Sequence, residues 1–274
     1  MYNMNRLHPS DAWRWLGSTT ELAGLTRRFA GRRDFVLLFH SIGGIRGANY
    51  NPNVTVEQFD EIVGTLSERY QAVDLPELLV PSQDTRFAVT FDDGFRSVYT
   101  SAFRILRAYE VPATVYICPE FIGDQNCELL RSRHGLRESA TDVMMTEEQV
   151  QQTVESELFT VGNHTATHAD LADVDAERLI QEIVGGKQQL ESDFDTEIER
   201  FSYPYGSMTE EAVDIVSQHH SIAVCSRRGL LTASPNRFRI PRLDGNRQAS
   251  SLYLETTDYG EIVRSIGRRL LNRL

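Results

Sequence analysis

The sequence predicts an α/β fold in which parallel strands alternate with helices, arranged as a sheet or a barrel. Two observations lead to this prediction. Short apolar runs of strand length recur along the 274 residues, and segments with the apolar spacing of helices separate them. Polar residues capable of chemistry follow these runs directly, as expected where the carboxyl ends of parallel strands build a site.

The individual elements follow from apolar spacing and from turn residues. We expect strands near 35–40, 70–74, 86–91, 112–118, 158–162, 198–203 and 221–225. Helices are expected near 55–69, 95–109, 146–156, 175–193 and 209–219. Thr146 and Gln149 have the capping-box form and mark the start of the helix at 146–156. The long polar stretch 119–145 predicts an irregular loop inserted near the site.

The chain is long enough for one large α/β core, and no internal repeat or linker divides it. We expect a single barrel domain over residues 34–246. A helical extension over 1–33 precedes it, and an amphipathic helix over 247–274 follows it.

The net charge of −11 argues against nucleic acid as a partner, although both ends of the chain are rich in arginine. Such basic amphipathic ends can lie on an anionic membrane, but packing on the barrel or in a dimer is the favoured interpretation. No apolar segment reaches the ~20 residues of a membrane span, and the N-terminus does not resemble a secretory signal. We therefore expect a cytoplasmic protein, or alternatively one that contacts the inner membrane face peripherally. The oligomeric state is not predicted.

Two polar clusters follow apolar runs. Asp92, Asp93 and Gly94 follow the run 87–91, and His164 and His168 follow the run 158–161. Asp93, His164 and His168 could be three ligands of a catalytic divalent metal, because histidines four apart project the same way if the segment turns helically. Such an ion lowers the pKa of bound water toward ~7, and Asp92 could then act as general base. On spacing alone, a turn and a chance histidine pair remain equally good explanations.

Three motifs together resemble the NodB-homology domain of the polysaccharide deacetylases, carbohydrate esterase family 4. They are Thr90-Phe91-Asp92-Asp93-Gly94, His164-Thr165-Ala166-Thr167-His168 and Tyr203-Pro204-Tyr205-Gly206. The resemblance implies a single-domain, incomplete (β/α)7 barrel. It also implies a metal, usually zinc, held by Asp93, His164 and His168, with Asp92 as base. The backbone N–H of Tyr205 would stabilise the oxyanion.

The sequence departs from the family pattern in two places. No histidine follows His220, whereas the usual catalytic-acid histidine lies late in the chain. His40 ends a segment that resembles the early histidine of poly-N-acetylglucosamine deacetylases, and is therefore our candidate general acid. Where many relatives carry an arginine that orients the base, this chain has Ser202. Arg242 could supply that charge, with Arg200 or Arg239 as alternatives.

The remaining histidines have no partner pattern and are interpreted as ordinary surface or loop residues: His8, His134, His219 and His220. The resemblance implies a hydrolase that removes N-acetyl groups from an amino sugar in a polysaccharide, an oligosaccharide or a glycolipid precursor. The alternatives are a relative that hydrolyses a non-sugar amide and a non-catalytic glycan-binding descendant. No organic cofactor site is expected.

Overall fold

The structure is a computed structural model that describes residues 34–44 and 54–256. The extension expected over 1–33 lies outside these residues, as does the arginine-rich tail. Of the segment 247–274, the structure describes only the part up to residue 256, with helix α10 (Ala249–Glu255). The three-part division of the chain therefore stays a prediction. No helix in the described part is long and apolar enough to cross a bilayer.

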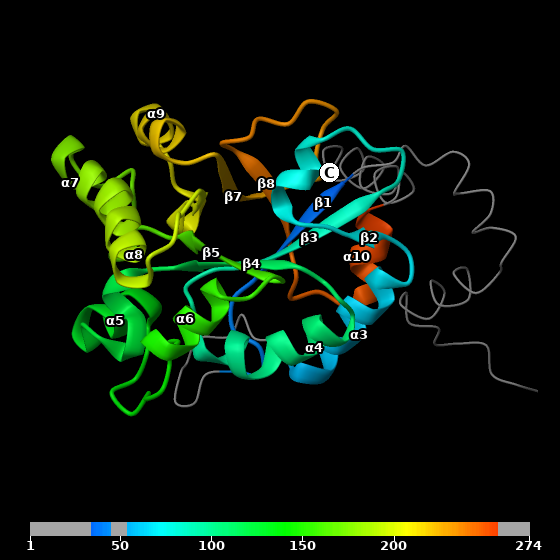
Figure 1. Cartoon of the computed structure of the whole chain (residues 1–274), viewed down its shortest axis with the longest axis horizontal. Helices are drawn as coiled ribbons and strands as arrows, with labels where there is room; N and C mark the ends of the chain where they lie inside the picture. The colour runs from blue at the N-terminus through cyan, green and yellow to red at the C-terminus, as the bar shows by residue number, and fades with distance from the viewer. Residues whose placement is uncertain (1–33, 45–53, 257–274) are drawn as a thin grey trace, which may run out of the picture. The chain divides into compact units, whose positions relative to one another are not determined.

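Seven parallel strands form a closed ring (Figure 1). Each strand pairs with its neighbour in the order β1-β3-β4-β5-β6-β7-β8, and β1 closes the ring by pairing with both β3 and β8. This is a (β/α) barrel with one strand fewer than the common eight, and it confirms the predicted fold class. The strands are β1 (Phe35–Phe39), β3 (Arg86–Phe91), β4 (Ala113–Ile117), β5 (Phe159–Asn163), β6 (Arg200–Ser202), β7 (Ile222–Arg228) and β8 (Ile240–Asp244).

The number of barrel strands matches the prediction, but one member differs. The strand expected at 70–74 is the two-residue β2 (Gln71–Ala72), which pairs only with β3 and lies outside the ring. The ring strand that is absent from the predicted ranges is β8. Pro241 interrupts its pattern, because proline cannot donate a ladder hydrogen bond and argues against a central strand.

The helices follow the predicted positions closely, and the capping box of Thr146 and Gln149 is confirmed. The irregular loop predicted over 119–145 is found only after residue 134, because the first part of this segment contains η3 and α5. Figure 1 shows α3, α4 and α6 along one side of the barrel and α7 to α9 along another. The helices are α3 (Val56–Ser67), η1 (Leu75–Leu79), η2 (Val98–Ala102), α4 (Phe103–Ala108), η3 (Pro119–Asp124), α5 (Cys127–His134), α6 (Glu147–Val154), α7 (Ala176–Ile180), η4 (Gln181–Gly185), α8 (Gly186–Phe194), η5 (Pro204–Gly206) and α9 (Glu210–His219).

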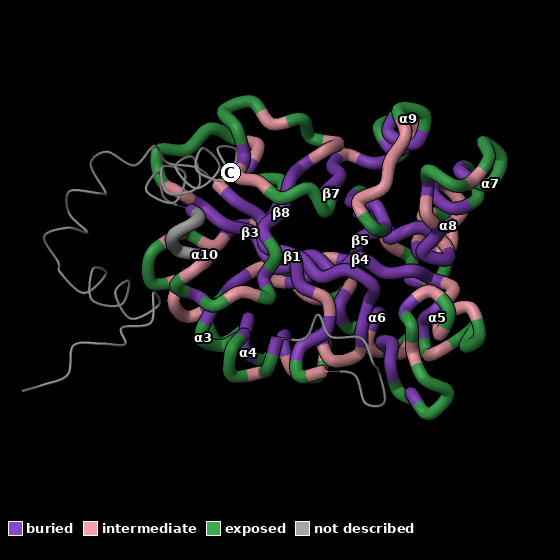
Figure 2. Tube along the Cα trace, turned by 180° about the vertical axis from the view of Figure 1, so that it is seen from behind, coloured by how far each residue is buried: buried purple, intermediate pink, exposed green. Residues whose placement is uncertain are grey.

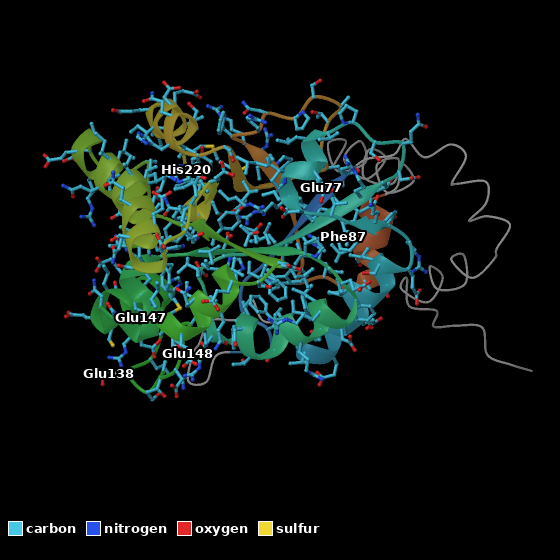
Figure 3. All side chains as sticks on the ribbon, viewed as in Figure 1. Glu77, Phe87, Glu138, Glu147, Glu148 and His220 are labelled. Carbon is cyan, nitrogen blue, oxygen red and sulfur yellow. The ribbon has the colours of Figure 1, made fainter. Side chains whose placement is uncertain are left out.

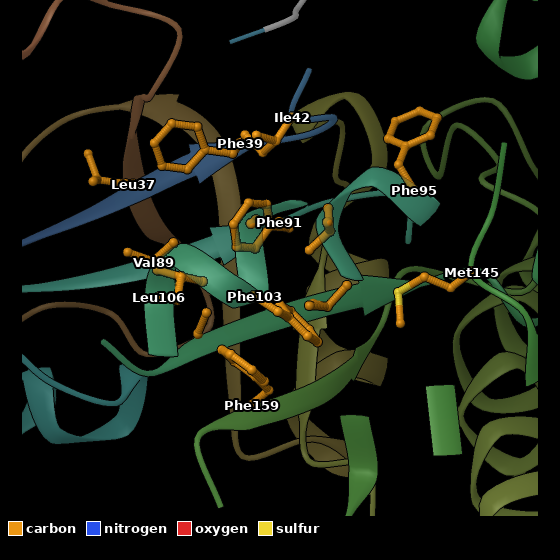
Figure 4. Packing of buried hydrophobic residues seen from close by; sticks show 14 of the residues in the cluster. Leu37, Phe39, Ile42, Val89, Phe91, Phe95, Phe103, Leu106, Met145 and Phe159 are labelled. Atoms are coloured by element: carbon orange, nitrogen blue, oxygen red, sulfur yellow. The ribbon is translucent and has the colours of Figure 1, made fainter. Parts of the chain in front are cut away.

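The side chains of the strands alternate between the helix layer and the barrel interior, as the pleat requires. In β3, Val89 and Phe91 point outward into the main apolar cluster (Figure 4), whereas Ala88 and Thr90 belong to the interior. The next inward position after Thr90 is Asp92. Figure 2 shows that the strands are buried, while exposed stretches lie on the outer sides of the helices and in the loops. Alternation thus places a carboxylate at the top of the barrel interior.

Two adjacent glycines in the long helical segment 176–194 differ sharply in their surroundings. A Cβ at Gly186 would lie 2.7 Å from the Ala166 nitrogen and 3.0 Å from Asn163 Oδ1, whereas one at Gly185 would meet nothing within 4 Å. The helix backbone at Gly186 therefore packs directly on the loop that follows β5.

We expect Gly185→Ala to raise the free energy of unfolding by up to about 1 kcal/mol, because alanine is the better helix former. Gly186→Ala should lower it by about 1–3 kcal/mol, because the added methyl group overpacks a backbone contact. Urea unfolding of the two variants beside the wild type measures the difference. Equal stability of the two variants would contradict the close packing.

Candidate active site

The two adjacent acids after β3 are separated by a change in backbone conformation. The Asp92 N–H still donates to the Phe39 carbonyl at 3.0 Å, which extends the pairing with β1. Asp93 then adopts a φ of 75° and Gly94 a φ of 77°. A left-handed φ is uncommon for a residue other than glycine, and such strain clusters at functional sites. After this turn the Asp93 side chain lies near histidines, whereas Asp92 contacts an arginine.

Asp92 forms a two-pronged ion pair with Arg242 of β8. Arg242 Nη1 donates to Asp92 Oδ1 at 2.7 Å and Nη2 donates to Oδ2 at 2.6 Å. The guanidinium also donates to Thr90 Oγ1 at 3.2 Å, to Ser202 Oγ at 3.1 Å and to the Cys225 carbonyl at 3.2 Å. Because Arg242 and Asp92 are 1% and 3% exposed, the pair is shielded from water and its geometry is fixed.

The alternative arginines are engaged elsewhere. Arg200 pairs with Asp74 and donates to Thr114 Oγ1. Arg239 pairs with Glu210 near the surface. Of the three arginines that the sequence offers, Arg242 is the one that contacts Asp92.

Burial alone would raise the pKa of both acids, but their neighbours outweigh it. The charges of Arg242 and His164 and the hydrogen bonds from Arg242 lower the pKa of Asp92 on balance. The pKa of Asp93 lies well below its usual value because His134 and the other imidazoles oppose the effect of burial. Both carboxylates are therefore ionised at neutral pH. Burial lowers the pKa of His134 to about 4, although the Asp93 charge opposes this shift. The His134 ring is therefore uncharged at neutral pH.

The histidines of the second motif meet at Asp93. His164 Nε2 lies 3.5 Å and His168 Nε2 lies 3.2 Å from Asp93 Oδ1. The segment does not turn helically as expected. Thr165 and His168 adopt left-handed φ values of 66° and 53°, and the resulting loop brings the two rings to a centroid distance of 4.9 Å.

Buried polar contacts fix this loop, which spans residues 164–168. Glu182, fully buried in η4, accepts hydrogen bonds from the Thr167 backbone N–H at 2.9 Å and from its hydroxyl at 2.6 Å. The Glu182 carbonyl also accepts from the Ala166 N–H at 2.9 Å. Arg178 Nη2 contacts the same carboxylate at 2.6 Å. Hydrogen bonds from the loop to Glu182 of η4 therefore hold the loop in this conformation.

The donor set of Asp93, His164 and His168 fits a divalent metal. Asp93 Oδ1 is buried, and neither imidazole contact meets hydrogen-bond geometry, so that this oxygen has no hydrogen-bond partner in the described part of the chain. Ligands about 2.0–2.2 Å from one tetrahedral ion lie roughly 3.4 Å apart, close to the two contacts above. His164 Nδ1 lies 2.8 Å from the Ser202 carbonyl, which can only accept, so Nδ1 carries the proton. In the neutral ring, the lone pair is then on Nε2, the atom that faces Asp93.

His40 and Tyr205 border the same region. His40 follows β1 directly, and the register of Phe39 with Phe91 places it level with Asp92 on the neighbouring strand. A positive charge on its ring would lower the pKa of Asp92 and of His134. Tyr205 in η5 is 54% exposed, with a φ of 57°, and its ring lies 4.6 Å from the ring of His168.

The interpretation of His134 and His220 as ordinary surface or loop residues is wrong. His134 at the end of α5 is buried, and ligand atoms of Asp93, His134 and His168 lie within 4.8 Å of one another. No spacing pattern in the sequence connects it to Asp93, but its position in the long segment after β4 was a usable signal. His220, labelled in Figure 3, follows α9, is buried and lies 3.2 Å from Asn163 Nδ2. His219 is exposed, and His8 lies outside the described residues.

Comparisons with known proteins identify the family of the chain. A model of the polysaccharide deacetylase family matches residues 80–223. The poly-β-1,6-N-acetyl-D-glucosamine N-deacetylase of Staphylococcus aureus (strain MRSA252) is 22% identical over 225 residues, which cover 77% of this chain and 72% of the relative.

Solved structures share the fold. The deacetylase PplD of Streptococcus pyogenes, in complex with acetate, has a TM-score of 0.66 at 19% identity, covering 82% of this chain and 98% of that one. IcaB from Ammonifex degensii has a TM-score of 0.63 at 22% identity, covering 78% of this chain and 92% of that one. Because the family model matches more than half of the 274 residues, the chain belongs to the polysaccharide deacetylase family and is an enzyme of that family.

Proposed function

We propose that this enzyme is a metal-dependent N-deacetylase that hydrolyses the N-acetyl group of an amino sugar in a polysaccharide, an oligosaccharide or a glycolipid precursor. The observation that supports it best is the division of the two acids. Asp93 faces His164 and His168, whereas Asp92 is held by Arg242. One carboxylate is thus available as a metal ligand, and the other remains ionised as a base.

Asp93, His164 and His168 would hold the ion, for which zinc is the first candidate because the set combines oxygen and imidazole ligands. When bound, a divalent ion supplies Lewis-acid chemistry, which polarises a carbonyl group and makes water more acidic. The Ser202 carbonyl fixes the orientation and tautomer of His164 for this purpose.

The remaining chemistry falls to side chains around the ligands. Asp92 would take the proton of the attacking water, and Arg242 would keep its carboxylate ionised and aimed. The backbone N–H of Tyr205 would stabilise the oxyanion that forms at the acetyl carbonyl. His40 would give a proton to the leaving nitrogen as the C–N bond breaks. Water and the amide are consumed, and acetate and a free amine are released.

The name of the Staphylococcus aureus relative supports an N-acetylglucosamine polymer as the first substrate to test. Acetate release should be measured from β-1,6-linked N-acetylglucosamine oligomers, beside β-1,4-linked ones, before and after removal of metal and after reloading with Zn²⁺. Acetate that disappears with the metal and returns with it would support the proposal. Acetate release that chelation leaves unchanged would contradict it, and a bound ion without acetate would redirect the substrate search to other amides.

We expect Asp92→Asn to retain the bound ion and to lose at least about 10²-fold in kcat, because an amide cannot take the proton. Elemental analysis and acetate release measure the two effects. Removing one partner of a buried ion pair costs about 3–5 kcal/mol, so circular dichroism must confirm folding. The control is Asp244→Asn, which changes an exposed acid on β8. Equal losses in both variants would argue against a specific role for Asp92.

Arg242→Gln should move the acidic limb of the pH–rate profile to higher pH by at least about one unit. The Arg242 charge is the largest influence that lowers the pKa of Asp92, and without it burial raises that pKa. Asp92 would then lose its charge at a higher pH than in the wild type. Arg239→Gln removes an arginine that pairs with Glu210 instead, and should leave the limb in place. An unshifted limb in Arg242→Gln would refute the assignment.

His40→Ala should lower kcat by about 10²–10⁴-fold while the bound ion is retained, because the leaving nitrogen loses its proton donor. His164→Ala, in contrast, should lose both the ion and turnover. Metal content and acetate release, measured on both variants, separate the two roles. Full activity of His40→Ala would show that the acid is another group.

A further inference from the structure

The crossover after β4 is anchored to the turn that carries the two acids. Phe95, next to that turn, forms an antiparallel bridge with Met144 at the far end of the crossover. Asp124 accepts hydrogen bonds from the backbone N–H groups of Val143 and Met144 at 2.8–3.1 Å, which closes the segment between them. The crossover is therefore a fixed wall beside the candidate metal site.

Helix α5 within this crossover ends so that its last residue points at the site. Gly135 adopts a φ of 61° at the C-cap and stops the helix directly after His134. The imidazole lies edge-on to two buried aromatic rings, with centroid distances of 5.5 Å to Phe95 and 5.8 Å to Phe121. The centroid of the His168 ring lies 4.8 Å from that of His134. The aromatic rings thus hold the imidazole against the candidate ligands.

The polar atoms of His134 have few partners. Nδ1 lies 3.9 Å from Asp93 Oδ2, beyond hydrogen-bond distance, and Nε2 is buried without a hydrogen-bond partner among the described residues. The two oxygens of Asp93 consequently face different histidines, because Oδ1 lies near His164 and His168. A buried polar atom without a partner is costly, so an imidazole placed here for packing alone would be a poor choice compared with phenylalanine.

We propose that His134 is a fourth protein ligand of the ion assigned above to Asp93, His164 and His168. This inference rests on the proposed metal site and adds to it a ligand from a segment outside the family motifs. The spatial grouping of Asp93, His134 and His168 supports it, since their ligand atoms lie within 4.8 Å of one another. His164 is not part of this group, so binding of one ion by all four residues requires their side chains to close around it. An extra imidazole would make the ion bind more tightly, and water or substrate would then have to reach it as a fifth ligand, an expansion that catalytic zinc sites allow.

The first test is the dissociation constant for Zn²⁺, measured by competition with a chromophoric chelator. His134→Phe should keep the packing on Phe95 and Phe121 and weaken Zn²⁺ binding at least about tenfold, since even the loss of an outer-shell partner costs about 10–100-fold. His219→Phe changes an exposed histidine and should bind Zn²⁺ like the wild type. An unchanged dissociation constant in a folded His134→Phe variant would overturn the inference alone. A wild type that binds no Zn²⁺ would overturn the proposed function as well.

The second test separates a ligand from a residue that merely positions Asp93. His134→Cys loaded with Co²⁺ should show a thiolate-to-cobalt charge-transfer band in the near ultraviolet, absent from the wild type. His168→Cys is the positive control and His219→Cys the negative control. A band in His168→Cys but none in His134→Cys would show that the residue at position 134 does not bind the ion.

Discussion

The buried ion pair between Asp92 and Arg242 is the interaction on which the site depends most. It joins β3 to β8 across the barrel interior, and both partners are almost fully buried. A lone carboxylate in such a place would take up a proton, because burial disfavours the charged form. The guanidinium prevents this and occupies both Asp92 oxygens. Asp93 is thereby the acid that remains free to face the histidines.

The rest of the molecule keeps these two acids apart and their partners in place. Strand alternation puts Asp92 and Arg242 on the same interior face, and the left-handed backbone at Asp93 turns the second acid away. Glu182 and Gly186, from the helix behind the loop, hold the segment between His164 and His168, in which Thr165 and His168 have left-handed backbone conformations. Precise placement of reacting groups is the principal contribution of such a scaffold to catalysis.

Much of this could be predicted because the signals are local. The apolar runs predicted two of the strands. The residues directly after these runs, Asp92 and Asp93 in one case and His164 and His168 in the other, predicted the polar groups at the strand ends. The strand β8 was not among the predicted strands, because Pro241 breaks the strand pattern. Its pairing with β1 shows that it closes the barrel. The position of His134 beside Asp93 was not predicted for another reason. It reaches Asp93 through the tertiary packing of α5 on Phe95, which no spacing along the chain encodes.

The most direct measurement of the division between the two acids is anomalous diffraction at the zinc edge from crystals of the Zn²⁺-loaded enzyme. The account predicts one strong peak about 2.0–2.2 Å from ligand atoms of Asp93, His164 and His168, with both oxygens of Asp92 still on Arg242. A peak coordinated by Asp92, or no peak at this end of the barrel, would contradict it.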